Sequence, residues 1–253
     1  MAKLGEWLLL LLESKEEGIY MLKDKLEPIN EKITEALEKR TGPKMTGDKV
    51  TITAVTKNHP SFIVIEALEA GLTNIGENRV QEAKKKKEEL PPGGSWHLIG
   101  HLQTNKAKQA VELFDIIESI DSEKLLKLIN QEAEKIGKVQ DILLQVNVAK
   151  EEQKSGFSLE EYEALLPNLT NFDKVRVRGL MVIAKQTDNV EETRPTFAEG
   201  YKLFTELQEK LGSENCNILS MGMTHDYWVA IEEGANAIRL GTALFGARDY
   251  SRK

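Results

Sequence analysis

Cysteine is nearly absent from this sequence, since Cys216 is the only one in 253 residues. A single thiol excludes an internal disulfide, and it also excludes a zinc site built from cysteines. Such a composition fits a reducing compartment, so we expect a cytoplasmic protein.

The sequence also lacks an apolar run long enough to cross a membrane. Its most apolar stretch, Trp7–Leu12, is far shorter than the roughly 20 residues that a membrane helix requires, and the charged segment Glu13–Glu17 ends it. Only Lys3 precedes the stretch and no small-residue cleavage pattern follows, so a signal peptide is not expected. We therefore predict no membrane partner. Residues 1–20 are interpreted as an N-terminal extension, helical or disordered, before a single domain over residues 21–253.

An excess of positive charge is missing as well, because the formal net charge is -7. This balance argues against a nucleic-acid-binding protein. The run Lys84–Lys87 is the one basic cluster of note, but Glu82 precedes it and Glu88 and Glu89 follow it. We interpret the run as the solvated face of a helix.

Apolar strand-like segments alternate with helical patterns along most of the chain. Alternation of this kind predicts a parallel sheet with right-handed crossovers. Eight such units favour an α/β fold of the single (β/α)8 TIM-barrel type, and no GxGxxG follows the first strand to favour an open dinucleotide-binding sheet. An additional N-terminal helix is expected over Met21–Arg40, where apolar residues recur every three or four positions. The expected strands are Val50–Lys57, Asn74–Glu77, Trp96–Ile99, Ile116–Ile120, Ile142–Val148, Val175–Ile183, Asn217–Met221 and Ala237–Leu240.

The first expected strand ends in Lys57, at the end of the barrel where active sites of this fold lie. Burial lowers the pKa of a lysine and makes its amine a better nucleophile. If the strand end is buried, Lys57 is the candidate nucleophile of the site.

The last expected strand carries a second unusual residue, Arg239. If Ile238 and Leu240 face the helices, alternation turns Arg239 into the barrel, where a guanidinium needs acceptors. Two interpretations remain open at this stage: a contact to a ligand, or an internal ion pair with Glu77 or Asp121.

Glycine-containing segments follow the seventh and eighth strands at Ser220–Thr224 and Arg239–Gly246. Loops in these two positions commonly form the phosphate-binding site of a TIM barrel. We therefore predict that a phosphate group binds between them.

A metal site is not expected, although His97 and His101 are four residues apart. The segment between them resembles a strand end rather than a helix, and no glutamate follows His97 as in a zinc-protease motif. His97 is interpreted as a packed strand residue, and His101 as a residue that faces the ligand. Lys154, in the loop after the fifth strand, is either a second amine at the site or a solvated lysine.

A strand-end lysine, a buried arginine and a phosphate site together suggest pyridoxal 5′-phosphate (PLP) held as a Schiff base. Several segments, in their order and spacing, closely resemble the YggS/PROSC family of PLP homeostasis proteins. These are AVTK (54–57), GENRVQE (76–82), WHLIGHLQTNKAK (96–108), QVNVAKEEQKSG (145–156), GLM (179–181), LSMGMTHD (219–226) and IRLGTALFGAR (238–248). The resemblance runs from about Met21 to the C-terminus.

The resemblance implies a barrel similar to the N-terminal domain of alanine racemase, with PLP bound to Lys57 and Arg239 facing the pyridine nitrogen. It further implies a set of residues around the phosphate and the ring. The chain departs from the usual family pattern at Thr56 and Thr224, where serine is commoner, and at Arg79, where an aromatic residue is common. The cofactor-binding residues predicted besides Lys57 and Arg239 are Asn78, His101, Ser220, Met221, Gly222, Gly241 and Thr242; no catalytic and no metal-binding residues are predicted.

Two functions compete on this basis. Racemases of this fold use a tyrosine from a second, all-β domain as the opposing acid or base, whereas here seven residues follow Gly246, with Tyr250 among them. We therefore predict an intracellular PLP-homeostasis protein that stores, protects or delivers the cofactor with little or no catalysis. A PLP-dependent amino-acid racemase, or a related enzyme, is the alternative. The expected partners are PLP and apo-forms of PLP enzymes, and a monomer is expected.

Overall fold

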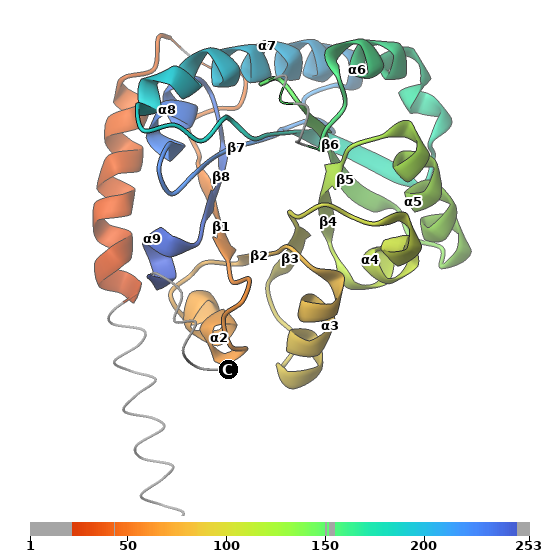
Figure 1. The fold of residues 1–253 in the computed structure, drawn as a ribbon, viewed down its shortest axis with the longest axis horizontal. Helices are drawn as coiled ribbons and strands as arrows, with labels where there is room; N and C mark the ends of the chain where they lie inside the picture. The colour runs from red at the N-terminus through yellow and green to blue at the C-terminus, as the bar shows by residue number, and fades with distance from the viewer. Residues whose placement is uncertain (1–21, 43, 150, 152–154, 247–253) are drawn as a thin grey trace, which may run out of the picture.

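The structure, a computed structural model, describes residues 22–42, 44–149, 151 and 155–246. Eight strands pair in chain order, and β8 pairs with β1, so the sheet closes into a barrel in which all pairings are parallel (Figure 1). The predicted TIM barrel is confirmed. Its strands are β1 (Thr51–Val55), β2 (Asn74–Glu77), β3 (Ser95–Leu98), β4 (Ile116–Ile120), β5 (Gln140–Val146), β6 (Val175–Val182), β7 (Ile218–Met223) and β8 (Ala237–Leu240).

Helices lie around the outside of the barrel in Figure 1, one or more after each strand. Short 3-10 turns precede or extend some of them: η1 (Thr104–Lys106), η2 (Leu166–Asn171) and η3 (Val190–Thr193). The helices are α2 (Phe62–Glu69), α3 (Val80–Glu89), α4 (Ala107–Leu113), α5 (Glu123–Lys135), α6 (Leu159–Leu165), α7 (Arg194–Leu211), α8 (Tyr227–Glu232) and α9 (Thr242–Phe245).

The predicted additional helix is present over residues 22–38 and lies beside the barrel (Figure 1). Its apolar face, with Leu22, Leu26, Ile29 and Ile33, is buried in the core. Arg40, just after the helix, donates from Nε to the carbonyl oxygen of residue 231 at 2.8 Å and from Nη2 to that of residue 235 at 2.8 Å. These bonds fix the end of the helix to the chain around α8.

Strand sequences rich in β-branched and apolar residues are typical of parallel strands that are buried on both faces. The face toward the helices is mostly apolar here, with Ala54, Ile75 and Leu98 fully buried. The inside of the barrel is instead partly polar, because Glu118 on β4 bonds Ser220 on β7. These two strands are not neighbours in the sheet, so their contact crosses the barrel interior.

Two expectations need correction. β1 ends at Val55, so Lys57 lies in the turn after the strand and not at its last position. The lysine run is not a uniformly solvated face: Lys84 and Lys85 are exposed, but Lys86 is buried at 3% exposure. In the part of the chain that is described, no helix combines the length and apolar character needed to span a membrane.

Gly179 in β6 occupies a position that other residues fit poorly. Its φ is +148°, and a Cβ there would lie 1.7 Å from the carbonyl oxygen of Ile218. The close approach permits the pairing of β6 with β7, where Gly179 is opposite Ile218.

Gly179→Ala is therefore expected to lower the free energy of unfolding by about 3 kcal/mol, because both backbone strain and overpacking oppose the added methyl group. Urea unfolding followed by circular dichroism measures the loss. Gly137→Ala is the control, since Gly137 also has a positive φ but a Cβ added there would meet no atom within 4 Å. The control is expected to lose about 1 kcal/mol, and equal losses in the two variants would contradict the packing argument.

Candidate functional site

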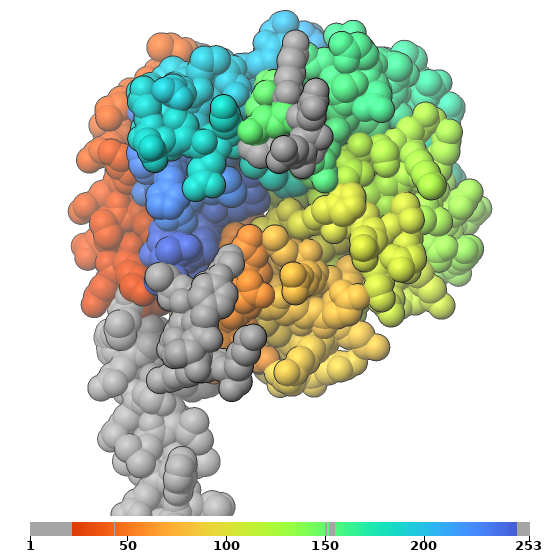
Figure 2. Space-filling view, in the orientation of Figure 1, coloured from red at the N-terminus to blue at the C-terminus, as the bar shows by residue number. Residues whose placement is uncertain are grey.

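A cavity of about 340 Å³ lies where the carboxyl ends of β1, β6, β7 and β8 meet. This volume falls within the range of small-molecule binding sites. Figure 2 shows the segments that carry its lining residues, in orange, cyan and blue, next to one another on this face. The lining residues are Val55, Lys57, His59, Asn78, Ile99, Ile183, Ala184, Lys185, Gln186, Thr187, Val190, Thr193, Met223, Thr224, His225, Asp226, Arg239, Gly241 and Thr242.

Lys57 and Arg239 line this one cavity, although they are 182 positions apart in the sequence (239 − 57). β1 and β8 are paired, with Thr53 opposite Arg239, and this pairing brings the two residues to the same part of the barrel. Lys57 is half-buried in the turn after β1, and the neighbouring Asn58 has a left-handed φ of 60°. The structure thus places an amine and a guanidinium at the same opening.

Arg239 points into the barrel, as the alternation of β8 predicts, and only 4% of it is exposed. Its Nη1 donates to Oγ of Ser220 at 2.7 Å, and its Nη2 donates to the carbonyl oxygen of Val182 at 3.1 Å. Ser220 in turn donates its hydroxyl proton to Oε2 of Glu118 at 2.6 Å. His97 Nδ1 lies 2.7 Å from Oε1 of the same carboxylate.

Of the two interpretations left open for Arg239, the internal ion pair with Glu77 or Asp121 is not the one that forms. Glu77 contacts Lys86 and Thr56, and Asp121 contacts His101. The carboxylate inside the barrel belongs to Glu118, which the sequence analysis did not single out. A glutamate in a short strand with three isoleucines was the available signal, because such a strand is buried on both faces.

Electrostatics couples these buried groups. Burial lowers the pKa of the Arg239 guanidinium, and the negative charges of Glu118 and Asp226 oppose that shift. Burial on its own acts to raise the pKa of Glu118. The hydrogen bond and charge of His97, the charge of Arg239 and the hydrogen bond from Ser220 together hold it below its ordinary value. Glu118 is thus held as a carboxylate whose charge balances the guanidinium.

The ends of β7 and β8 contribute polar groups suited to an anion. Thr224, Gly241 and Thr242 all line the cavity. The Thr224 hydroxyl accepts a hydrogen bond from the backbone N–H of Ala243 at 3.4 Å, which connects the two loops. A Cβ at Gly241 would lie 3.3 Å from the carbonyl oxygen of Val55, so a side chain would crowd the approach of this loop to β1.

Not every predicted site residue lines the cavity. Lys57, Asn78, Arg239, Gly241 and Thr242 do, whereas Ser220, Met221, Gly222 and His101 do not.

Three of these four residues, Ser220, Met221 and Gly222, lie in β7 and contact other parts of the protein. Ser220 bonds Glu118 and Arg239 inside the barrel. Met221 packs outward, since a Cβ on Gly200 of α7 would come within 2.8 Å of its sulfur, and Gly222 lies against α8. Their roles as cofactor ligands stay predictions.

His101 has a side chain that is 58% exposed and lies 2.9 Å from Oδ2 of Asp121 through Nδ1. It lines a neighbouring cavity of about 390 Å³ that shares only Asn78 with the first one. A contact between His101 and a ligand in the first cavity stays a prediction.

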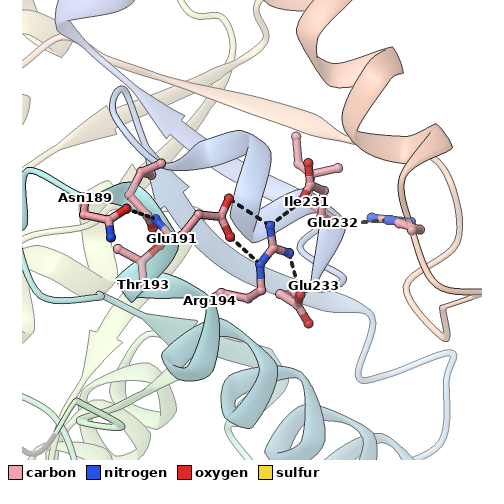
Figure 3. A network of polar contacts seen from close by, with 9 residues as sticks. Asn189, Glu191, Thr193, Arg194, Ile231, Glu232 and Glu233 are labelled. Atoms are coloured by element: carbon pink, nitrogen blue, oxygen red, sulfur yellow. Dashed lines mark hydrogen bonds and ion pairs between the residues drawn. The ribbon is translucent and has the colours of Figure 1, made fainter.

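The segment after β6 was missed by the sequence analysis, although Lys185, Thr187 and Thr193 line the cavity. No motif marks it, and only its place after a strand's carboxyl end could have drawn attention to it. Figure 3 shows how Arg194, at the start of α7, holds this wall in place.

Arg194 binds carboxylates on two sides. It contacts Glu191 within the segment at 2.7 Å, and it contacts Glu232 and Glu233 at the end of α8 at 2.6 and 2.8 Å (Figure 3). These hydrogen bonds raise the pKa of Arg194 above its ordinary value. The wall after β6 is thereby tied to the helix that follows β7.

Among the described residues, no group of three or more His, Cys, Asp or Glu side chains could hold a metal ion. Lys154, Tyr250 and residues 1–20 lie outside the described residues, so the interpretations given for them stay predictions.

Comparison with known proteins identifies the family. Residues 39–249 match the family described as "Alanine racemase, N-terminal domain". The pyridoxal phosphate homeostasis protein of Haemophilus influenzae is 36% identical over 229 residues, which cover 89% of this chain and 95% of that protein. The protein of the same name from Aquifex aeolicus is 40% identical over 228 residues, covering 90% and 98%. This chain belongs to the pyridoxal phosphate homeostasis protein family.

Solved structures agree with this family assignment. PipY of Synechococcus elongatus, in a structure described as having PLP bound, is 38% identical with a TM-score of 0.76, covering 89% of this chain and all of that chain. An alanine racemase from Clostridium difficile has a TM-score of 0.68 but is only 14% identical, and the match covers 57% of that chain. The likeness to the racemase therefore concerns the fold alone.

Proposed function

We propose that this protein binds PLP as a Schiff base on Lys57 and acts in PLP homeostasis by storing, protecting or delivering the cofactor. The observation that carries the proposal is that Lys57 and Arg239 line one cavity of about 340 Å³. The names of the relatives and the PLP-bound structure of PipY support it.

The groups around the cavity fit PLP in their chemistry. PLP supplies an aldehyde that reacts with a primary amine, a ring nitrogen that accepts a hydrogen bond, and a phosphate dianion. Lys57 provides the amine, and Arg239, a donor without acceptor capacity, suits the ring nitrogen. Thr224 and Thr242 provide hydroxyls, and Gly241 leaves backbone exposed, at the place where the phosphate would lie. Asn78 is proposed as a further contact.

The chemistry of Arg239 favours a carrier over a catalyst. A guanidinium does not transfer a proton to the ring nitrogen, so the ring stays a weak electron sink. Glu118 keeps the guanidinium charged, since its carboxylate faces it through Ser220. We therefore propose slow amino-acid chemistry at most. Apo-forms of PLP enzymes are the proposed recipients, and the barrel, residues 21–253, is the proposed functional unit.

Lys57→Ala is expected to abolish covalent PLP binding, because it removes the amine that forms the linkage. The bound cofactor should absorb at the edge of the visible range, and borohydride reduction should fix it to Lys57 for mass spectrometry. Lys185→Ala is the matched control, since Lys185 is a second amine that lines the same cavity. An absorbance band that survives Lys57→Ala but disappears in Lys185→Ala would refute the assignment.

Thr224→Val is expected to weaken the preference for PLP over pyridoxal, which lacks the phosphate, by about tenfold, because a hydrogen bond to a charged group is lost. Ser220→Ala should leave that preference unchanged, since the Ser220 hydroxyl contacts Glu118 and Arg239 instead. The ratio of the two binding constants, obtained from fluorescence titrations, measures the effect. A weaker preference in Ser220→Ala, together with an unchanged preference in Thr224→Val, would indicate that Ser220 is the phosphate ligand.

The holo-protein is expected to exchange the α-proton of L-alanine only slowly in heavy water and to form no appreciable D-alanine. NMR measures the exchange, and chiral chromatography measures the product. A racemase of known activity serves as the positive control. Rapid exchange together with D-alanine would support the racemase alternative in place of a carrier.

A further inference from the structure

Lys86 differs from the other members of the lysine run Lys84–Lys87. The side chains of Lys84 and Lys85 are 55% and 77% exposed and form i,i+4 ion pairs with Glu88 and Glu89 on α3. The side chain of Lys86 is only 4% exposed. An ammonium group is costly to bury unless charged and polar partners surround it, so the partners of Lys86 indicate its role.

These partners come from β2, from α3 and from the turn after β1. Lys86 Nζ donates to Oε1 of Glu77 on β2 at 2.6 Å, to Oε1 of Glu82 on its own helix at 3.0 Å, and to the carbonyl oxygen of Thr56 at 2.7 Å. The Thr56 hydroxyl also donates to Oε1 of Glu77 at 2.6 Å. One ammonium therefore lies between two carboxylates and a backbone carbonyl.

The same groups hold the backbone on both sides of Lys57. Thr56, directly before it, is bonded through its carbonyl to Lys86 and through its hydroxyl to Glu77. Asn58, directly after it, donates its backbone N–H to Glu82. Asn58 has a left-handed φ of 60°, which a residue other than glycine adopts at a cost of about 1 kcal/mol. The turn that carries Lys57 is thus held in an uncommon conformation from the side of α3.

Stability alone is a weak explanation for this arrangement. Replacing a buried ion pair by apolar side chains of similar volume is often neutral or stabilising. In addition, Oε2 of Glu77 is buried without a hydrogen-bond partner among the described residues, which makes the pair less favourable still. Burial also raises the pKa of Glu77, against the effect of Lys86. The placement of the backbone around Lys57 is the specific result of these contacts.

We propose that Lys86, together with Glu77 and Glu82, is a positioning residue that aims the Lys57 amine into the cavity. This inference rests on the proposed function, in which the neutral amine adds to the aldehyde carbon of PLP. The new bond joins Nζ to that carbon, and the aldehyde oxygen leaves with the two amine protons as water, so no oxidant or reductant is needed. The rate of such a step depends steeply on the direction and distance of approach of the amine.

The experiment compares Lys86→Met with Lys85→Met, a control that removes the same charge from the same helix at an exposed position. The first measurement is the rate of covalent attachment, followed by absorbance after mixing apo-protein with PLP. The second is the affinity for pyridoxine 5′-phosphate, which has an alcohol in place of the aldehyde and reports only non-covalent binding. Because Lys57 positioning concerns the covalent step alone, the two measurements separate it from a general loss of the site.

Lys86→Met is expected to slow attachment by on the order of tenfold or more and to leave the affinity for pyridoxine 5′-phosphate within about twofold of wild type. Lys85→Met should match wild type in both. Lys86→Met leaves the buried Glu77 carboxylate without its counter-charge, and this change can unfold the protein. Two more variants are therefore included. Glu77→Gln/Lys86→Met removes both buried charges, and Glu82→Gln removes the charged contact to Asn58; each should also slow attachment selectively.

Attachment at the wild-type rate in folded Lys86→Met, or in folded Glu77→Gln/Lys86→Met, would overturn the inference. Equal losses of attachment rate and pyridoxine 5′-phosphate affinity would also overturn it, because they indicate a general structural role. Failure of the proposed function itself has a different signature, since wild-type protein would then form no covalent adduct on Lys57.

Discussion

The constraint on which this structure depends is a guanidinium inside a closed barrel. Arg239 is almost fully buried, and a charge in that position must find both acceptors and a counter-charge within the barrel. The acceptors are Ser220 and a carbonyl of β6, and the counter-charge is Glu118 on the far side of Ser220. Closure of the sheet makes the arrangement available, because β4 and β7 approach each other only across the interior.

The direction of the Ser220 hydroxyl follows from these partners. Arginine only donates hydrogen bonds, so Ser220 must accept from Arg239 and give its own proton to Glu118. A serine with both contacts satisfied inside the barrel has little left to offer a phosphate group. Thr224, which lines the cavity four residues later, takes that place in the proposed site. Of the two positions at which serine is commoner in the family, Thr224 keeps its hydroxyl at the opening, whereas the Thr56 hydroxyl is bonded to Glu77.

The fold was predictable because it follows from patterns that are local in sequence. Alternating apolar strands and amphipathic helices predicted the barrel, and period-two alternation placed Arg239 inside it. The partner of Arg239 was not predictable in the same way, because Glu118 is 121 positions earlier in the chain (239 − 118) and meets it only across the closed sheet. Lys86 could not be distinguished from its neighbours either. Four consecutive lysines look alike in sequence, and only the rotation of α3 against β2 decides which one is buried.

Two buried networks of opposite composition meet at the cavity. Inside the barrel, the carboxylate of Glu118 balances the charge of the Arg239 guanidinium, and Arg239 itself faces the opening. Outside the barrel wall, two carboxylates surround one ammonium, and what faces the opening is the neighbouring residue Lys57. A ligand with an aldehyde and a ring nitrogen would contact both Lys57, beside the network of Lys86, and Arg239, in the network of Glu118. The distance between its two reactive points is fixed by covalent bonds, so it can bind productively only if β1 and β8 hold Lys57 and Arg239 at a matching separation. Direct pairing of these two strands brings the residues together, and the contacts of Lys86, Glu77 and Glu82 with the turn that carries Lys57 complete the placement.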